Sequence, residues 1–477
     1  MVFSSNEFLF LYLPLSLILY FAVPLRYRNL ALFLVSLVFY GWEKPVYLLI
    51  MMFIIIVNYV FGYLIGRAED AAAKKRALIL GVAINVATLG FFKYADFLLE
   101  NLGSIPGLGF IEPMGIALPI GISFYTFQSM SYIIDVYRGE STVQKSFVNF
   151  GAYVSMFPQL IAGPIVRYSD VDRELNERKC TLDGAADGMR RFCIGLAKKV
   201  LLADTAGALW EQIKDIPRGQ ASVLVLWLGI ILYAFQIYFD FSGYSDMGIG
   251  LGKLLGFRFP ENFNYPYISR SITEFWRRWH MTLSTWFKEY VYIPLGGNRH
   301  GTKRLVFNLL IVWLLTGFWH GAEWNFVIWG LYYFVLLVAE KLFLKRWLDK
   351  LPSLISHAYS LFFILIGWLI FYFKPDFGGW SAFSSYFLGM FGGLGLPLSN
   401  LEFSYTLVRN MLLIAILAFA STPYPREAYF KLKERLAGKR SGTILAAVCD
   451  AALVAIFVLC IVYISSSDYR PNIYFEF

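Results

Sequence analysis

The sequence is poor in charged residues. Asp, Glu, Lys and Arg make up 16% of its 477 residues, and hydrophobic residues make up 58%. Soluble globular proteins carry about 25% charged residues. Many apolar runs here approach or reach the roughly 20 residues that a helix needs to cross a bilayer. We therefore predict an all-α, polytopic integral membrane protein.

Other features that would indicate a different class are also missing. The four cysteines, Cys180, Cys193, Cys449 and Cys460, contain no Cys-x-x-Cys pair and no metal-ligand spacing, so we expect isolated thiols and no metal site. The net charge of +9 comes without any RNA- or DNA-binding motif. Its basic residues lie between apolar runs, as in the cytoplasmic loops of membrane proteins. We therefore expect membrane lipids as partners and no nucleic acid.

The apolar runs predict where the membrane helices lie. Residues 1–7 lack a positive n-region and an evident cleavage site, so the first run is expected to be retained rather than removed as a signal peptide. We find no internal repeat and no long soluble domain. The clearest runs are 8–24, 29–42, 45–65, 77–95, 114–134, 223–239, 305–318, 324–343, 358–373, 407–421 and 443–464.

Loop charges predict the orientation of these helices. The basic segments 67–76, 166–200 and 425–440 are expected in the cytoplasm. The segments 96–113 and 375–406, which lack Lys and Arg, are expected outside together with both termini.

The apolar stretch 147–165 does not fit this alternation, because cytoplasmic-looking segments flank it on both sides. It contains Pro158, Gly163 and Pro164, which suits a re-entrant element lining a cavity. A failure of the charge rule on a weak loop is the alternative.

Histidine is scarce, with four residues in the chain. His320 lies in Thr316-Gly-Phe-Trp-His-Gly-Ala-Glu-Trp324, between two long apolar runs. A histidine at membrane depth is costly unless it faces protein, water or substrate, and it titrates near neutrality. His320 is therefore a candidate catalytic residue, with a structural hydrogen bond as the alternative. His300 and His357 lie in predicted cytoplasmic loops and receive no role.

The segment 257–330 is too charged and too aromatic for an ordinary spanning helix. Trp and Arg residues of this kind are typical of helices that lie at the membrane interface. On a continuous helix, Trp276, His280 and Ser284 would share one face.

Three motifs in this segment resemble membrane-bound O-acyltransferases. They are Trp-His-x-x-Leu-Ser-x-Trp at 279–286, Tyr-Ile-Pro-Leu-Gly-Gly-Asn-Arg at 292–299 and Gly-Phe-Trp-His-Gly at 317–321. The chain ends, Met1-Val-Phe-Ser-Ser5 and Tyr474-Phe-Glu-Phe477, resemble the bacterial branch that exports acetyl groups onto alginate and related polysaccharides. The resemblance implies one transmembrane domain over 1–477, a helical shell around a funnel with re-entrant helices, and a core motif region at 257–330.

The resemblance also implies a function. Members of the family move an acyl group from a cytoplasmic thioester to a hydroxyl on the far side of the membrane. The role of the family's tunnel histidine is assigned to His320, and that of its second histidine to His280, for which a structural hydrogen bond is the alternative. We expect acetyl-CoA or another acyl thioester as cosubstrate, no tightly bound cofactor, a polysaccharide acceptor and a location in the bacterial plasma membrane. A neutral, buried imidazole suits a general base.

Further candidates are less specific. Gln236 and Asp240, near Ser242 and Asp246, are polar groups at membrane depth; a helix-packing cluster is the alternative. Asn262, Asn264, Trp276 and Ser284 are candidates for donor binding or the tunnel. Arg277 and Arg278 are candidates for donor phosphates, or for lipid headgroups.

The tail 465–477 is expected outside. Its Tyr474 offers a nucleophilic hydroxyl and resembles the carrier tyrosine of a small partner protein in D-alanyl export. We therefore consider that Tyr474 is transiently acylated and hands the group to an extracytoplasmic esterase-like (SGNH-type) transferase. Aromatic anchoring at the membrane interface is the alternative.

The sequence disfavours three alternative functions. D-alanyl transfer to teichoic acid is disfavoured by the length of the chain and by its own aromatic tail. A secondary transporter would show two related halves with paired broken helices, and none are found. A lipid-modifying eukaryotic relative is disfavoured by the two terminal motifs.

Overall fold

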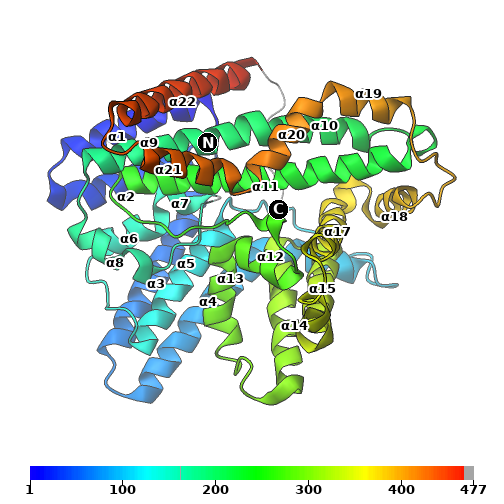
Figure 1. The fold of residues 1–477 in the computed structure, drawn as a ribbon. Coiled ribbons are helices and arrows are strands. Elements are labelled where there is room, and N and C mark those ends of the chain that lie inside the picture. Colours follow the sequence, from blue (N-terminus) through cyan, green and yellow to red (C-terminus); the bar gives the residue numbers. More distant parts are fainter. Residues whose placement is uncertain (162, 467–477) are drawn as a thin grey trace. The chain divides into compact units, whose positions relative to one another are not determined.

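The computed structural model describes residues 1–161 and 163–466. Every regular element in this part of the chain is a helix, without any β-strand (Figure 1), so the predicted all-α class is confirmed. The chain divides into two compact units, each built from two segments. The first unit comprises Met1–Gly195 and Tyr244–Glu261, and the second comprises Leu196–Gly243 and Asn262–Phe477.

Within the described residues, seven helices are long and apolar enough to cross a membrane, or eight if one bent pair forms a single span. Each of the seven overlaps one of the predicted apolar runs, which confirms a multi-pass membrane protein. They are α3 (Tyr47–Arg67), α4 (Ala71–Gly103), α11 (Val223–Leu254), α14 (Gly301–His320), α15 with its continuation (Trp324–Leu348), α17 (Ser353–Tyr372) and α22 (Arg440–Ser466).

The remaining runs form shorter or broken helices. The first two correspond to the apolar helix Glu7–Ala22 and to α2 (Arg28–Gly41). The run 407–421 falls on α19 (Leu401–Arg409) and α20 (Met411–Ala420), which meet at 63°.

The prediction of one helix across 114–134 is wrong at its start. Helix α5 begins only at Ile122 (Ile122–Arg138). Gly121 before it has a φ of +73°, and a Cβ there would lie 2.6 Å from the carbonyl oxygen of Leu160. The left-handed backbone, which glycine adopts at little cost, and this close approach prevent the helix from extending backwards.

The proline-containing stretch 147–165 is interrupted. It forms α6 (Phe147–Ser155) and the short α7 (Phe157–Leu160), separated at Met156. Pro158 occupies the first turn of α7, where its missing N–H costs nothing. Most side chains of both helices are buried. The stretch is therefore two short helices and not one, and its re-entrant path stays a prediction.

In the first unit, α3 and α4 form a hairpin held by a pair of amides. Asp70 caps α4 by accepting hydrogen bonds from the backbone N–H groups of Ala72 and Ala73. Further along, the Asn58 and Asn85 side chains each donate to the other's oxygen at 2.9 Å. Both side chains are fully buried, and interhelical hydrogen bonds of this kind help membrane helices associate.

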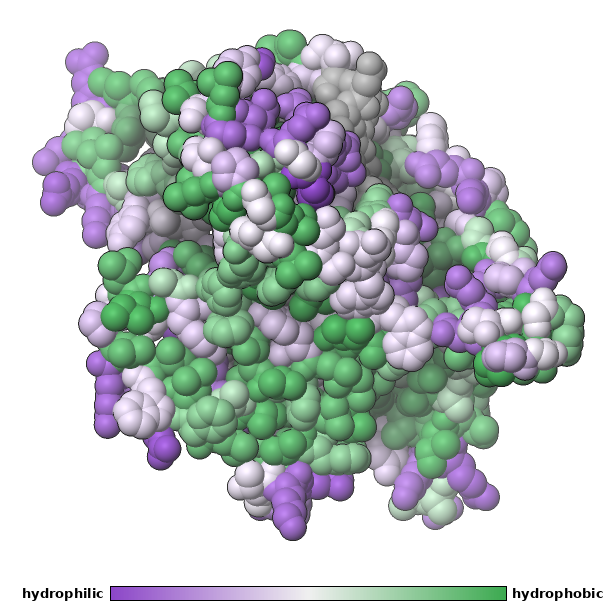
Figure 2. All heavy atoms as spheres, turned by 90° about the vertical axis from the view of Figure 1, so that its right-hand side faces the viewer, coloured by the Kyte–Doolittle hydropathy of each residue, from purple (hydrophilic) through white to green (hydrophobic). Residues whose placement is uncertain are grey.

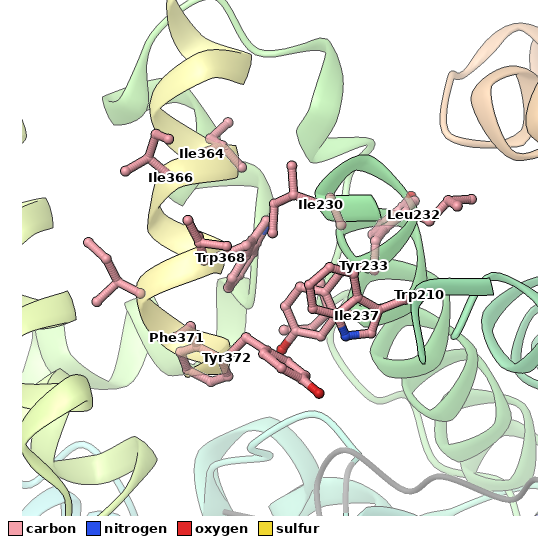
Figure 3. Packing of buried hydrophobic residues seen from close by; sticks show 14 of the residues in the cluster. Trp210, Ile230, Leu232, Tyr233, Ile237, Ile364, Ile366, Trp368, Phe371 and Tyr372 are labelled. Atoms are coloured by element: carbon pink, nitrogen blue, oxygen red, sulfur yellow. The ribbon is translucent and has the colours of Figure 1, made fainter. Parts of the chain in front are cut away.

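The second unit is built around an aromatic core. Trp210 of α10 (Asp204–Lys214), Tyr233 of α11 and Tyr372 of α17 contact one another, with ring centroids 4.8–5.4 Å apart. Figure 3 shows these rings packed with Trp368 and neighbouring isoleucines between the helices. This core anchors α17, which carries residues of the candidate site.

Helices α14 and α15 approach each other closely through two glycines. A Cβ on Gly317 would lie 2.4 Å from the carbonyl oxygen of Phe326, and a Cβ on Gly330 would lie 2.4 Å from that of Trp313. Small residues allow such close packing between membrane helices.

Large apolar side chains remain on the outside, and Figure 2 shows broad hydrophobic areas on the molecular surface.

Candidate functional site

His280 lies at a break between two short helices. Helix α12 (Ile272–Arg278) ends before it, and α13 (Met281–Phe287) begins directly after it. The backbone of His280 is left-handed, with a φ of +44°, which is strained for a residue with a side chain. The expectation that Trp276, His280 and Ser284 share one face of a continuous helix is therefore wrong, because the helix axis is interrupted at His280.

Asn262 holds this strained turn. Its side-chain oxygen accepts hydrogen bonds from the Thr282 backbone N–H at 3.3 Å and from the Thr282 hydroxyl at 2.9 Å, and it lies 3.1 Å from His280 Nδ1. Two backbone hydrogen bonds, both 2.9 Å long, also hold the turn. The Met281 N–H donates to the Asn262 carbonyl oxygen, and the Asn264 N–H donates to the Arg278 carbonyl oxygen. The turn is thus over-determined, as a strained conformation requires.

The same contacts assign the proton on His280. Because the Thr282 backbone can only donate, the Asn262 atom it meets is the oxygen, and His280 Nδ1 must donate to that oxygen. The lone pair of the neutral ring then lies on Nε2. His280 is outside the candidate spans, and burial lowers its pKa well below the usual 6.5, with the nearby imidazole of His320 lowering it further. The ring is therefore neutral at physiological pH.

His320 is the last residue of α14, and it is 9% exposed. Its ring contacts Trp329 of α15, with centroids 4.9 Å apart, and Phe371 of α17, at 5.3 Å. The next residue, Gly321, leaves the helix with extended backbone. A Cβ on Gly321 would lie 2.1 Å from the Phe326 ring, so this position needs glycine for His320 to keep its place.

The two histidines converge on Trp319. The Trp319 ring centroid is 5.6 Å from that of His280 and 5.0 Å from that of His320. His280 also packs against Phe241 in a T-shaped arrangement, with ring centroids 4.6 Å apart. Two motifs 40 residues apart in the sequence thereby form one buried aromatic site with two imidazoles.

Trp276 and Ser284 support this site from different positions. The Trp276 ring packs against Trp329 at 5.4 Å and Tyr333 at 4.9 Å, so it lies behind the Trp329 ring that contacts His320. The Ser284 hydroxyl donates to the carbonyl oxygen of Trp276 at 3.3 Å, which ties α13 to α12.

Asn264 and Arg277 have exposed side chains, and the structure does not bring them to the two imidazoles. Arg278 forms a salt bridge with Glu274 at 2.9 Å. The tail residue Tyr474 lies outside the described residues.

Asp240 belongs to a buried ion cluster that the sequence did not reveal. Lys199 lies 2.6 Å from Asp240 and 2.7 Å from Asp204, and all three side chains are largely buried. Lys199 lies within the basic segment 166–200, whose cytoplasmic location stays a prediction, and its side chain is buried in an ion pair and not exposed. A lysine directly before an apolar stretch, with a carboxylate five residues later, was the available signal.

The cluster brings two carboxylates, Asp204 and Asp240, to the Lys199 ammonium group. Burial raises the pKa of Asp204 to about 7; Lys199 opposes that shift and Asp240 adds to it. Gln236 is buried one helical turn before Asp240. The residue after Asp240 is Phe241, which contacts His280, so the cluster lies one residue away from the aromatic site.

Asp246 has a separate partner in the first unit. Arg191 forms salt bridges with Asp246 at 2.8 Å and with Glu261. Asp246 therefore belongs to an ion-pair network within the first unit. Ser242, the remaining polar residue of that stretch, is buried.

Comparison with known proteins identifies the family of this chain. The model of the membrane-bound O-acyltransferase family matches residues 138–374. A probable alginate O-acetylase of Azotobacter vinelandii is 40% identical, over the full length of both chains. One of Pseudomonas aeruginosa is 47% identical over 78% of this chain and 72% of its own.

A peptidoglycan O-acetyltransferase of Helicobacter pylori is 36% identical over 78% of this chain and 77% of its own. The resemblance stated from the motifs at 279–286, 292–299 and 317–321 is therefore confirmed. The chain belongs to the membrane-bound O-acyltransferase family, in the alginate O-acetylase branch, and is an O-acyltransferase that acts in polysaccharide acetylation.

Proposed function

We propose that this enzyme takes an acetyl group from a cytoplasmic thioester, with acetyl-CoA as the donor, and passes it across the bacterial plasma membrane for O-acetylation of a cell-surface polysaccharide. The observation that supports this proposal is the pair of buried imidazoles, His280 and His320, which meet at Trp319. An acyl transfer to a hydroxyl needs a base at the reacting atoms, and the site supplies two candidates.

His320 is the general base in this proposal. It removes the proton from the acceptor hydroxyl while the new C–O bond forms at the thioester carbonyl. The tetrahedral intermediate then collapses, the C–S bond breaks, and the thiolate leaves and takes the proton back from the imidazolium. General-base catalysis of this kind contributes about 10²- to 10⁴-fold.

His280 has a supporting role. Its Nδ1 is occupied by Asn262, so Nε2 is the nitrogen that accepts a hydrogen bond from substrate or from water. A neutral imidazole with a fixed tautomer suits the orientation of a donor or acceptor group. Trp276, Ser284, Gln236 and Asp240 support the walls of this site, and Asn262 holds its turn.

We further propose that the outer tail carries the acyl group onward. In this scheme the Tyr474 hydroxyl is the first acceptor, and an extracytoplasmic esterase-like transferase then moves the acetyl group from the tyrosyl ester to the polysaccharide. Intact-mass measurement of the tail peptide tests this step. An acetyl adduct that is lost in His320→Ala supports it, whereas full polymer acetylation with Tyr474→Phe contradicts it.

The decisive experiment is complementation of a gene deletion. His320→Ala is expected to abolish acetylation of the surface polymer while the protein remains in the membrane at wild-type level. His357→Ala is the matched control, because its ring Nδ1 lies 3.2 Å from the Ser269 carbonyl oxygen and the sequence assigns it no role. Retained acetylation in His320→Ala would overturn the assignment. Recovery of D-alanine in place of acetate on the polymer would favour D-alanyl transfer.

A further inference from the structure

Glu340 is a buried carboxylate that binds the start of another helix. It follows α15 (Trp324–Ala339) as the first residue of the π-helical stretch η7 (Glu340–Leu344), and it is 1% exposed. Its Oε1 accepts a hydrogen bond from the Ile272 backbone N–H at 2.7 Å. Its Oε2 accepts from the Thr273 backbone N–H at 2.8 Å and from the Thr273 hydroxyl at 2.6 Å.

A third helix joins the same carboxylate. The Tyr359 hydroxyl of α17 donates to Glu340 Oε1 at 3.2 Å. Four hydrogen bonds from two other elements therefore end on one buried side chain. Hydrogen bonds to a charged acceptor are shorter and stronger than neutral ones, and in a buried place a lost partner leaves the remaining donors unsatisfied.

The three helices that meet at Glu340 also carry the neighbours of the two histidines. Helix α12, whose first residues bind Glu340, runs directly into Trp279 and His280. Helix α15 places Trp329 against His320, and α17 places Phe371 against the same ring. Helix α17 also places Trp368 against Trp279, with centroids 4.8 Å apart.

Glu340 is the first residue of the π-helical stretch η7. A π-helical turn inserts one extra residue and thereby redirects the side chains that follow it, and such turns are frequent at functional sites. Ser271 already satisfies the Glu274 N–H at the start of α12, so α12 has a local cap of its own. The additional contact from Glu340 therefore locates α12 against α15 and α17.

We propose that Glu340 is a positioning residue that sets the place of the His280 turn relative to His320. The proposal rests on the proposed function in that both histidines act in acyl transfer. Misplacement of a reacting group by about 1 Å can cost about 10²-fold in rate. Loss of the carboxylate is therefore expected to slow the chemical step more than it weakens donor binding.

The test uses the full-length enzyme in lipid nanodiscs, with acetyl-CoA as donor, a soluble oligosaccharide of the surface polymer in excess as acceptor, and release of the free thiol as the signal. Glu340→Gln keeps the shape of the side chain but replaces one acceptor oxygen with an amide NH₂ group. That group cannot accept a hydrogen bond from the N–H groups of α12. We expect kcat to fall by at least about tenfold, with the KM for acetyl-CoA within about twofold of wild type. Glu340→Asp, which keeps the charge, is expected to restore part of kcat.

Two controls separate positioning from simple stability. Ser271→Ala removes the local cap of α12 and should lower thermal stability with kcat retained. Tyr359→Phe removes one of the four donors and should change kcat less than Glu340→Gln does. If Glu340→Gln melts earlier but has wild-type kcat per folded molecule, the proposal is overturned.

A structural measurement makes the outcome independent of the reaction. A cryo-EM structure of Glu340→Gln is expected to show the His280 ring displaced from Trp319, and an unchanged separation would also overturn the proposal. If wild type and His320→Ala release thiol equally, the proposed function fails, and the cryo-EM comparison still decides whether Glu340 positions His280.

Discussion

The Asn262 side-chain oxygen accepts a hydrogen bond from Nδ1 of His280 at 3.1 Å. This contact fixes the tautomer of a buried imidazole and holds it on a left-handed backbone. Because burial also lowers the pKa of His280 below 6.5, the ring stays neutral as the pH falls through the range in which an exposed histidine gains a proton.

Replacing Asn262 with Asp should change the pH dependence of the enzyme. The carboxylate still accepts from His280 and Thr282, but its negative charge favours the imidazolium, so the pKa of His280 rises. The acidic limb of the kcat–pH profile for acetyl transfer should therefore move to higher pH, by about one unit or more. Thr282→Val, which removes a donor without adding charge, is the control. An unshifted acidic limb in Asn262→Asp would contradict the assignment.

Replacing Gly321 with Ala should disturb His320. The added Cβ would lie 2.1 Å from the Phe326 ring, so either the ring or the end of α14 must move. We expect a loss of stability of about 1–3 kcal/mol, together with a loss of acetyl transfer. Thermal unfolding in detergent and polymer acetylation measure the two effects.

Gly90→Ala is the matched control for this substitution. Gly90 lies inside α4, and a Cβ there meets nothing within 4 Å. Alanine favours the helix by about 1 kcal/mol over glycine, so this variant should be fully active and at least as stable as wild type. Equal losses in both variants would mean that the Phe326 contact is unimportant.

Asp204 should make the stability of the protein depend on pH. Its pKa rises from 3.8 to about 7 on folding, so between these values the folded protein holds a proton that the unfolded chain releases. Stability from this group therefore falls as the pH rises through that window. Asp204→Asn should flatten the decrease in melting temperature between pH 5.5 and pH 8. Asp215→Asn, an exposed carboxyl just after the same helix, should leave the slope unchanged, and an unchanged slope in Asp204→Asn would refute the prediction.

The Asn58–Asn85 pair should show strong coupling. Either single replacement by Leu leaves one buried amide without its partner across the helices, at a cost of about 1–3 kcal/mol. The double replacement removes both polar groups and should cost less than the sum of the two. A double-mutant cycle on unfolding free energies measures this difference. Additive losses would show that the two amides do not stabilise each other.

The composition and the apolar runs were enough to predict the membrane helices. Runs such as 45–65 and 358–373 are long and nearly free of charge, so local hydropathy alone is enough to predict that they form membrane helices. For the run 114–134 the start of the helix was predicted wrongly. Hydropathy does not show that Gly121 adopts a left-handed backbone beside Leu160. The ion pairs of Lys199 with Asp204 and Asp240 were not predicted either, since these partners are recognised only in three dimensions.

The motifs were enough to predict the family and to single out His280 and His320. Trp276, His280 and Ser284 do not share one helix face as their spacing predicted. The helix is interrupted at His280, whose strained backbone is held by hydrogen bonds to another segment of the chain. The neighbours Trp329 and Phe371 were missed, since they look like ordinary residues of apolar helices.

Apolar run length and contiguous motifs are local properties, so they were enough to predict an all-helical membrane protein of the O-acyltransferase family. Tertiary packing was needed to show that two histidines from separate motifs meet at Trp319, that Asn262 sets the tautomer of one of them, and that Glu340 joins α12, α15 and α17. These contacts join residues far apart along the chain, and their geometry depends on how the helices pack.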